Sequence, residues 1–339
     1  MSQVTEIVPP FIDIVKPLRV RQVARPTTGE WIRHLALFGL TAITTTIAGV
    51  MLLGPDVDPG VQPPSGFIGS LLFLPQYYFR AVGALIFHAF ANPAILMQGI
   101  TFSAALLSIL AAHEAGHYIA CRRYGVDATL PFFIPAPPLF LAGTFGAFIK
   151  IKSPIPSRRA LFDIGLAGPL AGFVVALPIA VAGIVNLHSI PLPAGDGIIF
   201  NDPLLFRLIG RAFRVNLDNT ALNPFYMAAW IGLLVTSLNL MPVSQLDGGH
   251  GIFALFGPRA HRTIGRTAFV MMAVIAMLGW LWHGSPSGFL YALLLGIMLR
   301  VRHPQPQEME PLGRARVGVA VITLLVFILS FWPFPITIT

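Results

Sequence analysis

The chain has 339 residues, of which 55% are hydrophobic and 11% charged. A soluble domain averages about 25% charged residues, so this chain has too few charges to cover a water-exposed surface of its size. The composition argues against soluble globular, disordered and nucleic-acid-binding classes. The formal charge of +8 fits the Lys and Arg excess of cytoplasmic loops in membrane proteins. A single cysteine excludes an internal disulfide and a zinc cluster built on cysteines.

Apolar segments recur along the chain, and a bilayer crossing needs roughly 20 helical residues. We predict about seven transmembrane helices, with six as the alternative count, and therefore an all-α polytopic membrane protein. The fifth and sixth segments are short enough to form a tight helical hairpin. The predicted spans are residues 35–53, 101–120, 160–187, 222–240, 268–282, 287–299 and 317–334.

The Lys and Arg residues gather in alternate loops. Of the 22, 18 lie in residues 1–34, 121–159, 243–267 and 300–316. The positive-inside rule places these loops in the cytoplasm, together with the N-terminus. We therefore interpret residues 1–34 as a basic cytoplasmic tail.

Two apolar regions do not fit simple spans. Residues 65–100 are interrupted by two prolines and an arginine, and the charge pattern requires zero or two crossings, so we favour interfacial or re-entrant segments. Residues 129–150 contain too many Pro and Gly residues for a helix and too many Phe residues for an aqueous loop. Non-helical backbone at membrane depth must be covered by protein or water. We predict a small re-entrant β-like hairpin with an edge strand at 143–150; an interfacial loop is the alternative.

The segment His113-Glu114-Ala115-Gly116-His117 carries the clearest chemistry. Residues i and i+4 share one helix face, so the two imidazoles can hold one zinc, and the Glu between them can act on a water that the metal activates. The pattern alone is moderately specific. Ionisable groups inside a spanning helix are costly, however, and seldom lack a role. The alternative is a polar contact between helices.

Asp247 is the candidate for a third ligand, because catalytic zinc usually has three protein ligands and one open position. It follows Asn239, which lies at the cytoplasmic end of the fourth predicted span, and precedes two glycines that permit a sharp turn. The predicted topology brings Asp247 and His117 to the membrane from the same side. For Asp247 taken alone, a helix N-cap is the alternative.

Three motifs in this order resemble the site-2 protease family of intramembrane zinc metalloproteases. They are the His-Glu-x-x-His helix, a Gly-Pro element at 168–172, and an Asn-x-x-Pro-x-x-x-Leu-Asp-Gly segment at 239–248. The resemblance covers about residues 100–260, and stretches between the motifs look like bacterial and plant-plastid members. It therefore implies an integral multi-pass protein, which we assign to a bacterial cell membrane, without the PDZ or nucleotide-binding regulatory modules of some relatives.

The resemblance also implies one Zn²⁺ per chain, bound by His113, His117 and Asp247, with Glu114 as the general base. Some family members carry an Asn at the last position of the Gly-Pro element, where this chain has Gly172. We predict that Asn239 supplies the missing amide donor to the oxyanion. A helix-packing hydrogen bond is the alternative for Asn239.

The predicted function is cleavage of transmembrane segments in single-span membrane proteins, by metal-activated water and a Glu base. A metal-binding or metal-transport protein without hydrolysis is the alternative, but the polar groups gather at one depth and do not line a path. Partners are the substrates and the lipid bilayer, with no nucleic acid, and the oligomeric state stays open. We expect His250 to cap a helix or face headgroups, with the orientation of Asp247 as the alternative, and His303 to be an interfacial residue. The predicted organisation is 1–34 tail, 35–100 first span with interfacial segments, 101–250 catalytic core and 251–339 C-terminal helices.

Overall fold

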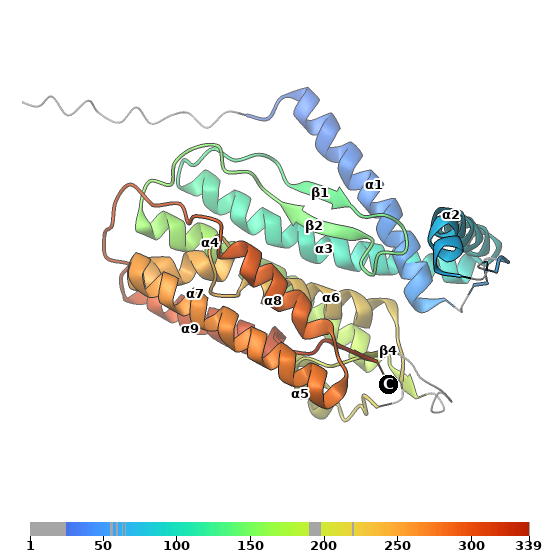
Figure 1. Ribbon diagram of the computed structural model, residues 1–339. Coiled ribbons are helices and arrows are strands. Elements are labelled where there is room, and N and C mark those ends of the chain that lie inside the picture. Colours follow the sequence, from blue (N-terminus) through green and yellow to red (C-terminus); the bar gives the residue numbers. More distant parts are fainter. Residues whose placement is uncertain are drawn as a thin grey trace, which may run out of the picture.

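The computed structural model describes residues 25–54, 57–58, 60–62, 64, 66–189, 198–218 and 220–338. The predicted basic tail therefore lies mostly outside the described residues. Helices dominate the described part (Figure 1). They are α1 Thr28–Leu53, α2 Phe67–Ala91, α3 Pro93–Arg123, α4 Arg158–Val185, α5 Leu204–Phe213, α6 Pro224–Asn239, α7 Asp247–His283, α8 Ser287–Met298 and α9 Arg314–Ser330.

Five of these helices, α1, α2, α3, α4 and α7, are long and apolar enough to cross a membrane, and α6 and α8 are shorter apolar helices. Each of the seven predicted spans falls within a helix, apart from residues at the ends. The predicted polytopic all-α class is thereby confirmed. In Figure 1, α2 is seen nearly end-on, whereas α3, α4 and α7 are seen from the side. The axis of α2 thus crosses those of the main bundle.

Helix ends differ from the predicted spans where local capping extends a helix past its apolar part. Thr27 and Glu30 form a reciprocal capping box, with hydrogen bonds of 3.2 and 2.9 Å, so α1 already begins within the predicted tail. Pro93 starts α3 eight residues before the predicted span, at a position where its missing N–H costs nothing. α7 begins at Asp247 and continues through a kink at Gly257, whose φ is 81°.

The predicted hairpin is present. Strand β1, Phe132–Pro135, pairs antiparallel with β2, Thr144–Phe148, and the pair lies beside α1 and over α3 (Figure 1). The strand is shorter than the predicted 143–150. Gly143 enters it with φ 65°, and a Cβ there would come within 2.4 Å of the Thr44 carbonyl oxygen of α1. Only glycine permits this approach of the hairpin to α1.

Two further short strand pairs lie outside the sequence prediction. β3, His188–Ser189, pairs with β5, Thr220–Ala221, and β4, Ile198–Phe200, pairs with β6, Ile336–Ile338. The second pair joins a loop in the middle of the chain to its C-terminal part. Such short strands give no periodic signal of their own, because each is defined by its distant partner.

Two hydrophobic clusters flank the middle of α3. One cluster includes Phe102 and Ile109 of α3 with Met227 of α6. The other includes Cys121 of α3 and Phe162 of α4. The segment from His113 to His117 lies between them along α3, so its polar side chains are held within a tightly packed, largely apolar frame.

Candidate metal centre

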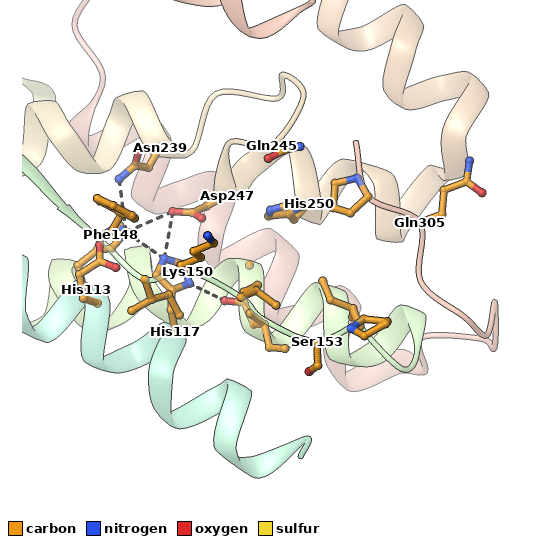
Figure 2. A pocket seen from close by; sticks show the side chains of 18 residues that line it. His113, His117, Phe148, Lys150, Ser153, Asn239, Gln245, Asp247, His250 and Gln305 are labelled. Atoms are coloured by element: carbon orange, nitrogen blue, oxygen red, sulfur yellow. Dashed lines mark hydrogen bonds and ion pairs between the residues drawn. The ribbon is translucent and has the colours of Figure 1, made fainter. Parts of the chain in front are cut away.

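Three polar side chains from two helices meet at one point. Nε2 of His113 lies 3.1 Å from Nε2 of His117, and both nitrogens approach Oδ2 of Asp247, at 3.2 and 3.3 Å (Figure 2). The two histidines are buried, and the side chain of Asp247 is 15% exposed. The structure therefore brings together the residues predicted as ligands, although His113 and Asp247 are 134 positions apart along the chain.

The spacing of these atoms suits a tetrahedral metal ion. Bonds of about 2.0–2.1 Å to zinc separate neighbouring tetrahedral ligand atoms by roughly 3.3 Å. The three observed separations of 3.1, 3.2 and 3.3 Å match this edge. Two imidazoles and one carboxylate are also a donor set that zinc accepts in catalytic sites. The residues present therefore fit the predicted ion.

The ring of His117 is held in place by a hydrogen bond on the side away from the ligand atoms. Its Nδ1 lies 2.7 Å from the carbonyl oxygen of Ile164 on α4. Because a carbonyl oxygen only accepts, Nδ1 carries the proton and Nε2 presents its lone pair to the centre. Gly168 makes room for the ring, since a Cβ there would lie 2.0 Å from His117 Nε2. The glycine of the Gly-Pro element is thus required where α4 passes the ligand.

Glu114 and the metal-ligand set border one cavity of about 600 Å³. Its other walls include Phe148 at the end of β2, the following residues up to Ile151, and the polar side chains of Asn239 and His250. Glu114 is buried and lines this cavity together with Ile149, in the chain segment that follows the hairpin strand.

Asn239 lies at the end of α6, where its Nδ2 is 3.3 Å from His113 Nε2 (Figure 2). The predicted amide donor is therefore within reach of the same point as the ligands. Gly172, in contrast, faces the backbone side of His113: a Cβ there would lie 3.2 Å from His113 Cβ. An amide side chain at 172 is absent, and Asn239 is the amide that approaches the centre.

Comparison with known proteins identifies the family. A model described as peptidase family M50 matches residues 101–281, more than half of the chain and all of the predicted site. The chain belongs to peptidase family M50. This confirms the resemblance to site-2 proteases.

The M50 chain is also similar to plant proteins named probable zinc metalloproteases, chloroplastic. It is 32% identical to EGY1 of Oryza sativa subsp. japonica, over 67% of this chain and 39% of that protein. For EGY2 of Arabidopsis thaliana the identity is 29%, over 80% of this chain and 49% of the relative. The chain thus spans less than half the length of these relatives. No solved structure matches it.

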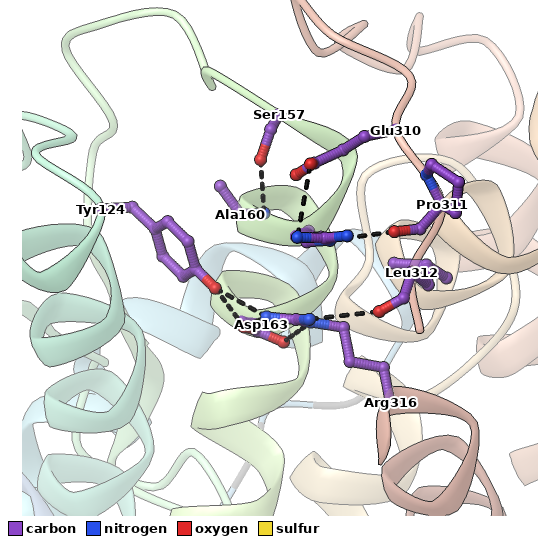
Figure 3. Close-up of polar contacts among 9 residues, drawn as sticks. Tyr124, Ser157, Ala160, Asp163, Glu310, Pro311, Leu312 and Arg316 are labelled. Carbon is purple, nitrogen blue, oxygen red and sulfur yellow. Dashed lines mark hydrogen bonds and ion pairs between the residues drawn. The ribbon is translucent and has the colours of Figure 1, made fainter. Parts of the chain in front are cut away.

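Near the start of α4, hydrogen bonds among Tyr124, Asp163 and Arg316 connect α4 and α9 with the end of α3 (Figure 3). We call these three residues the polar clamp. Arg316 of α9 binds the Asp163 carboxylate of α4 through two bonds of 2.7 and 2.8 Å. The Tyr124 hydroxyl, just past α3, donates to the same carboxylate. Burial raises the pKa of Tyr124 above its usual value, which keeps that donor protonated. The clamp sits one residue before Ile164, whose carbonyl orients His117.

Sequence reasoning missed the contact between His250 and His303. Nδ1 of His250 lies 2.8 Å from Nε2 of His303, and the ring of His303 stacks on Phe253 at 4.2 Å. His303 is therefore half-buried and packs against His250 and Phe253 of α7. Nothing in the local pattern around residue 303 indicates this, because its partners come from a helix that starts 56 residues earlier.

Proposed function

We propose that this chain is an intramembrane zinc metalloprotease that cleaves the transmembrane segments of single-span membrane proteins. The observation that carries the proposal is the convergence of His113, His117 and Asp247 beside Glu114, on one cavity within a bundle of apolar helices. The family and the names of its relatives support a zinc metalloprotease. One Zn²⁺ per chain is part of the proposal.

The roles of the side chains follow from their positions. Zinc, when bound by the two histidines and Asp247, would supply a Lewis acid that polarises a carbonyl and lowers the pKa of water toward ~7. Glu114 would accept the proton of the attacking water and pass it to the leaving amine. Asn239 would donate its amide hydrogen to the oxygen that gains negative charge. General-base assistance of this kind is worth about 10²–10⁴ in rate.

The hairpin supplies a place for an unwound substrate. β2 pairs with β1 along one edge, and no strand in the described part of the chain pairs with its other edge. The segment after β2 lines the cavity next to Glu114. Because successive amides of a strand point to opposite edges, Ala147 turns its N–H to the same side as Ile149. An extended peptide added there would run toward the centre. A transmembrane helix must unwind locally to expose such a peptide.

The membrane orientation belongs to the proposal as well. The Lys and Arg distribution supports a cytoplasmic N-terminus, and with it a site near the cytoplasmic ends of α3 and α6. We propose a bacterial cell membrane as the location, while the relatives are named chloroplastic.

The test compares membrane proteomes of native cells that express the normal chain, Glu114→Gln or Glu310→Gln. Glu310 pairs with Arg159 away from the cavity, so it controls for the loss of one carboxylate. We expect uncut single-span proteins to accumulate with Glu114→Gln alone, while the purified variant retains zinc. A proteome unchanged by Glu114→Gln, together with altered cellular zinc, would instead support metal transport.

The strand hypothesis has its own test, with the substrate so identified. Ala147→Pro removes an outward N–H, whereas Ala147→Gly retains it. We expect the proline variant to lose about tenfold or more in cleavage, in line with the loss of main-chain hydrogen bonds in strand addition, and the glycine variant to stay near normal. Equal turnover by both variants, each with full zinc content, would refute strand addition at this edge.

A further inference from the structure

A second cavity, of about 400 Å³, adjoins the cavity that contains the candidate metal centre. Most of its walls come from α7 beyond the Gly257 kink and from the segment 299–305 after α8, and Ser244 and Phe253 complete them. It shares Gln305 with the wall of the larger cavity, but none of the metal-ligand candidates. It is therefore a separate recess that borders the larger cavity at Gln305.

The α7 wall is one face of a helix. The lining positions recur at the i, i+3, i+4, i+7 and i+8 spacing of a single stripe. Gly265 in the middle of this stripe adds no side chain, so the space between its neighbours stays open. The stripe consists of Pro258, His261, Arg262, Gly265 and Arg266.

The opposite wall is held in place by its backbone. Ser244 Oγ donates to the carbonyl oxygen of Val301 at 2.7 Å, and Gln245 Nε2 donates to that of Arg302 at 2.7 Å. The stacking of His303 on Phe253 fixes the end of the segment. The main chain is thus anchored, while the side chains of Arg300 and Arg302 are exposed beside the cavity.

The positive charges of the four arginines that line this recess are therefore not balanced by acidic side chains. The lining contains no Asp or Glu, and none of the ion pairs among the described residues involves Arg262, Arg266, Arg300 or Arg302. Like charges gathered around one recess repel each other, and an anion placed between them removes that cost. The guanidinium fork matches the oxygens of phosphate in bidentate geometry.

We propose that this recess binds a phosphate group. The shared chemistry has two sources on the cytoplasmic side that the Lys and Arg distribution indicates: the headgroup of an anionic phospholipid, or a soluble phosphorylated molecule. The site is independent of peptide cleavage, because its lining contains none of the residues assigned to that reaction.

The test measures binding to the purified full chain in a neutral detergent. The probes are pyrophosphate, phosphatidylglycerol and, as the uncharged comparison, phosphatidylcholine. Binding is followed by the rise in thermal unfolding midpoint, which grows with the ratio of ligand concentration to Kd. We expect pyrophosphate or phosphatidylglycerol to raise the midpoint and phosphatidylcholine to have no effect. A response to pyrophosphate identifies a soluble ligand, and a response to phosphatidylglycerol alone identifies a headgroup.

Two double variants, from separate elements, guard against a simple folding defect. Arg262→Gln/Arg266→Gln and Arg300→Gln/Arg302→Gln should each weaken binding at least tenfold. Arg123→Gln/Arg314→Gln removes the same charge from exposed positions outside both cavities and should bind normally. The proposal is overturned if neither anion binds the normal chain, or if the control pair loses as much affinity as the pocket pairs. Each variant's midpoint without ligand and its zinc content report its folding.

Discussion

Two groups of histidines lie side by side in this protein and differ in what their ring nitrogens face. In the first group, Nε2 of His113 and Nε2 of His117 point at each other and at the Asp247 carboxylate. In the second, each ring contacts a different partner: His250 bonds His303, His303 lies 2.6 Å from the Pro304 carbonyl oxygen, and His261 lies 3.3 Å from that of Ser244.

The difference teaches that histidine content alone does not define a metal site. A metal ion needs several lone pairs aimed at one point, and a carboxylate among them helps to balance its charge. The second group has no carboxylate, and its hydrogen bonds join the start of α7 to the 299–305 segment. The first group is built for a ligand, and the second is built to pack two parts of the chain together.

The largest expected effect comes from removing the carboxylate of the first group. Asp247→Ala should abolish stoichiometric zinc binding, since loss of a direct ligand exceeds the 10–100-fold typical of residues that only support ligands. His250→Gln, three residues away, should retain near-full zinc. Metal analysis of the two purified chains decides the matter. Full zinc in Asp247→Ala would remove Asp247 from the ligand set.

The second-largest expected effect tests the space that Gly168 leaves for the His117 ring. Gly168→Ala places a Cβ 2.0 Å from the ring nitrogen, whereas Gly172→Ala places one 3.2 Å from His113 Cβ. Overpacking of this kind costs about 1–3 kcal/mol, and at position 168 the clash is with the ring of a predicted ligand. We expect Gly168→Ala to lose most of its zinc and Gly172→Ala to keep most of it. Equal zinc contents would show that the ring has room to shift.

The smallest effect concerns the second group. His303→Gln removes a hydrogen bond and a ring contact, which should lower the free energy of unfolding at pH 7 by about 1 kcal/mol, with zinc unchanged. Burial, with the neighbouring His250 and His261, lowers the pKa of His303 to about 3. His188, which lies exposed, gives the matched control His188→Gln.

The pH dependence follows from that pKa. Between about pH 6.5 and 3, His303 takes up a proton in the unfolded chain but not in the folded one, so its contribution to stability falls as the pH falls. The normal chain should therefore lose its stability advantage over His303→Gln on acidification through this window. Unfolding midpoints measured across the range test this, and an advantage of the normal chain that grows on acidification would contradict it.

The sequence by itself determined the membrane class, the main helices and the pair of histidines on α3. These are short-range properties: an apolar run long enough for a bilayer makes a spanning helix, and two histidines four residues apart share a helix face whatever surrounds them. The number of ligands that catalytic zinc needs and the predicted topology then indicated Asp247, the motifs shared with the family indicated Asn239, and the Pro, Gly and Phe content of residues 129–150 predicted a hairpin.

Only the tertiary structure decided where these pieces meet. The approach of Asp247 Oδ2 to both imidazoles, the Ile164 carbonyl that orients His117, and the space that Gly168 leaves for its ring depend on how α4 and α7 pack against α3. The same holds for His303 and for the arginines around the second cavity. Their positions depend on contacts between residues far apart along the chain, and no local pattern records which distant helix will supply the partner.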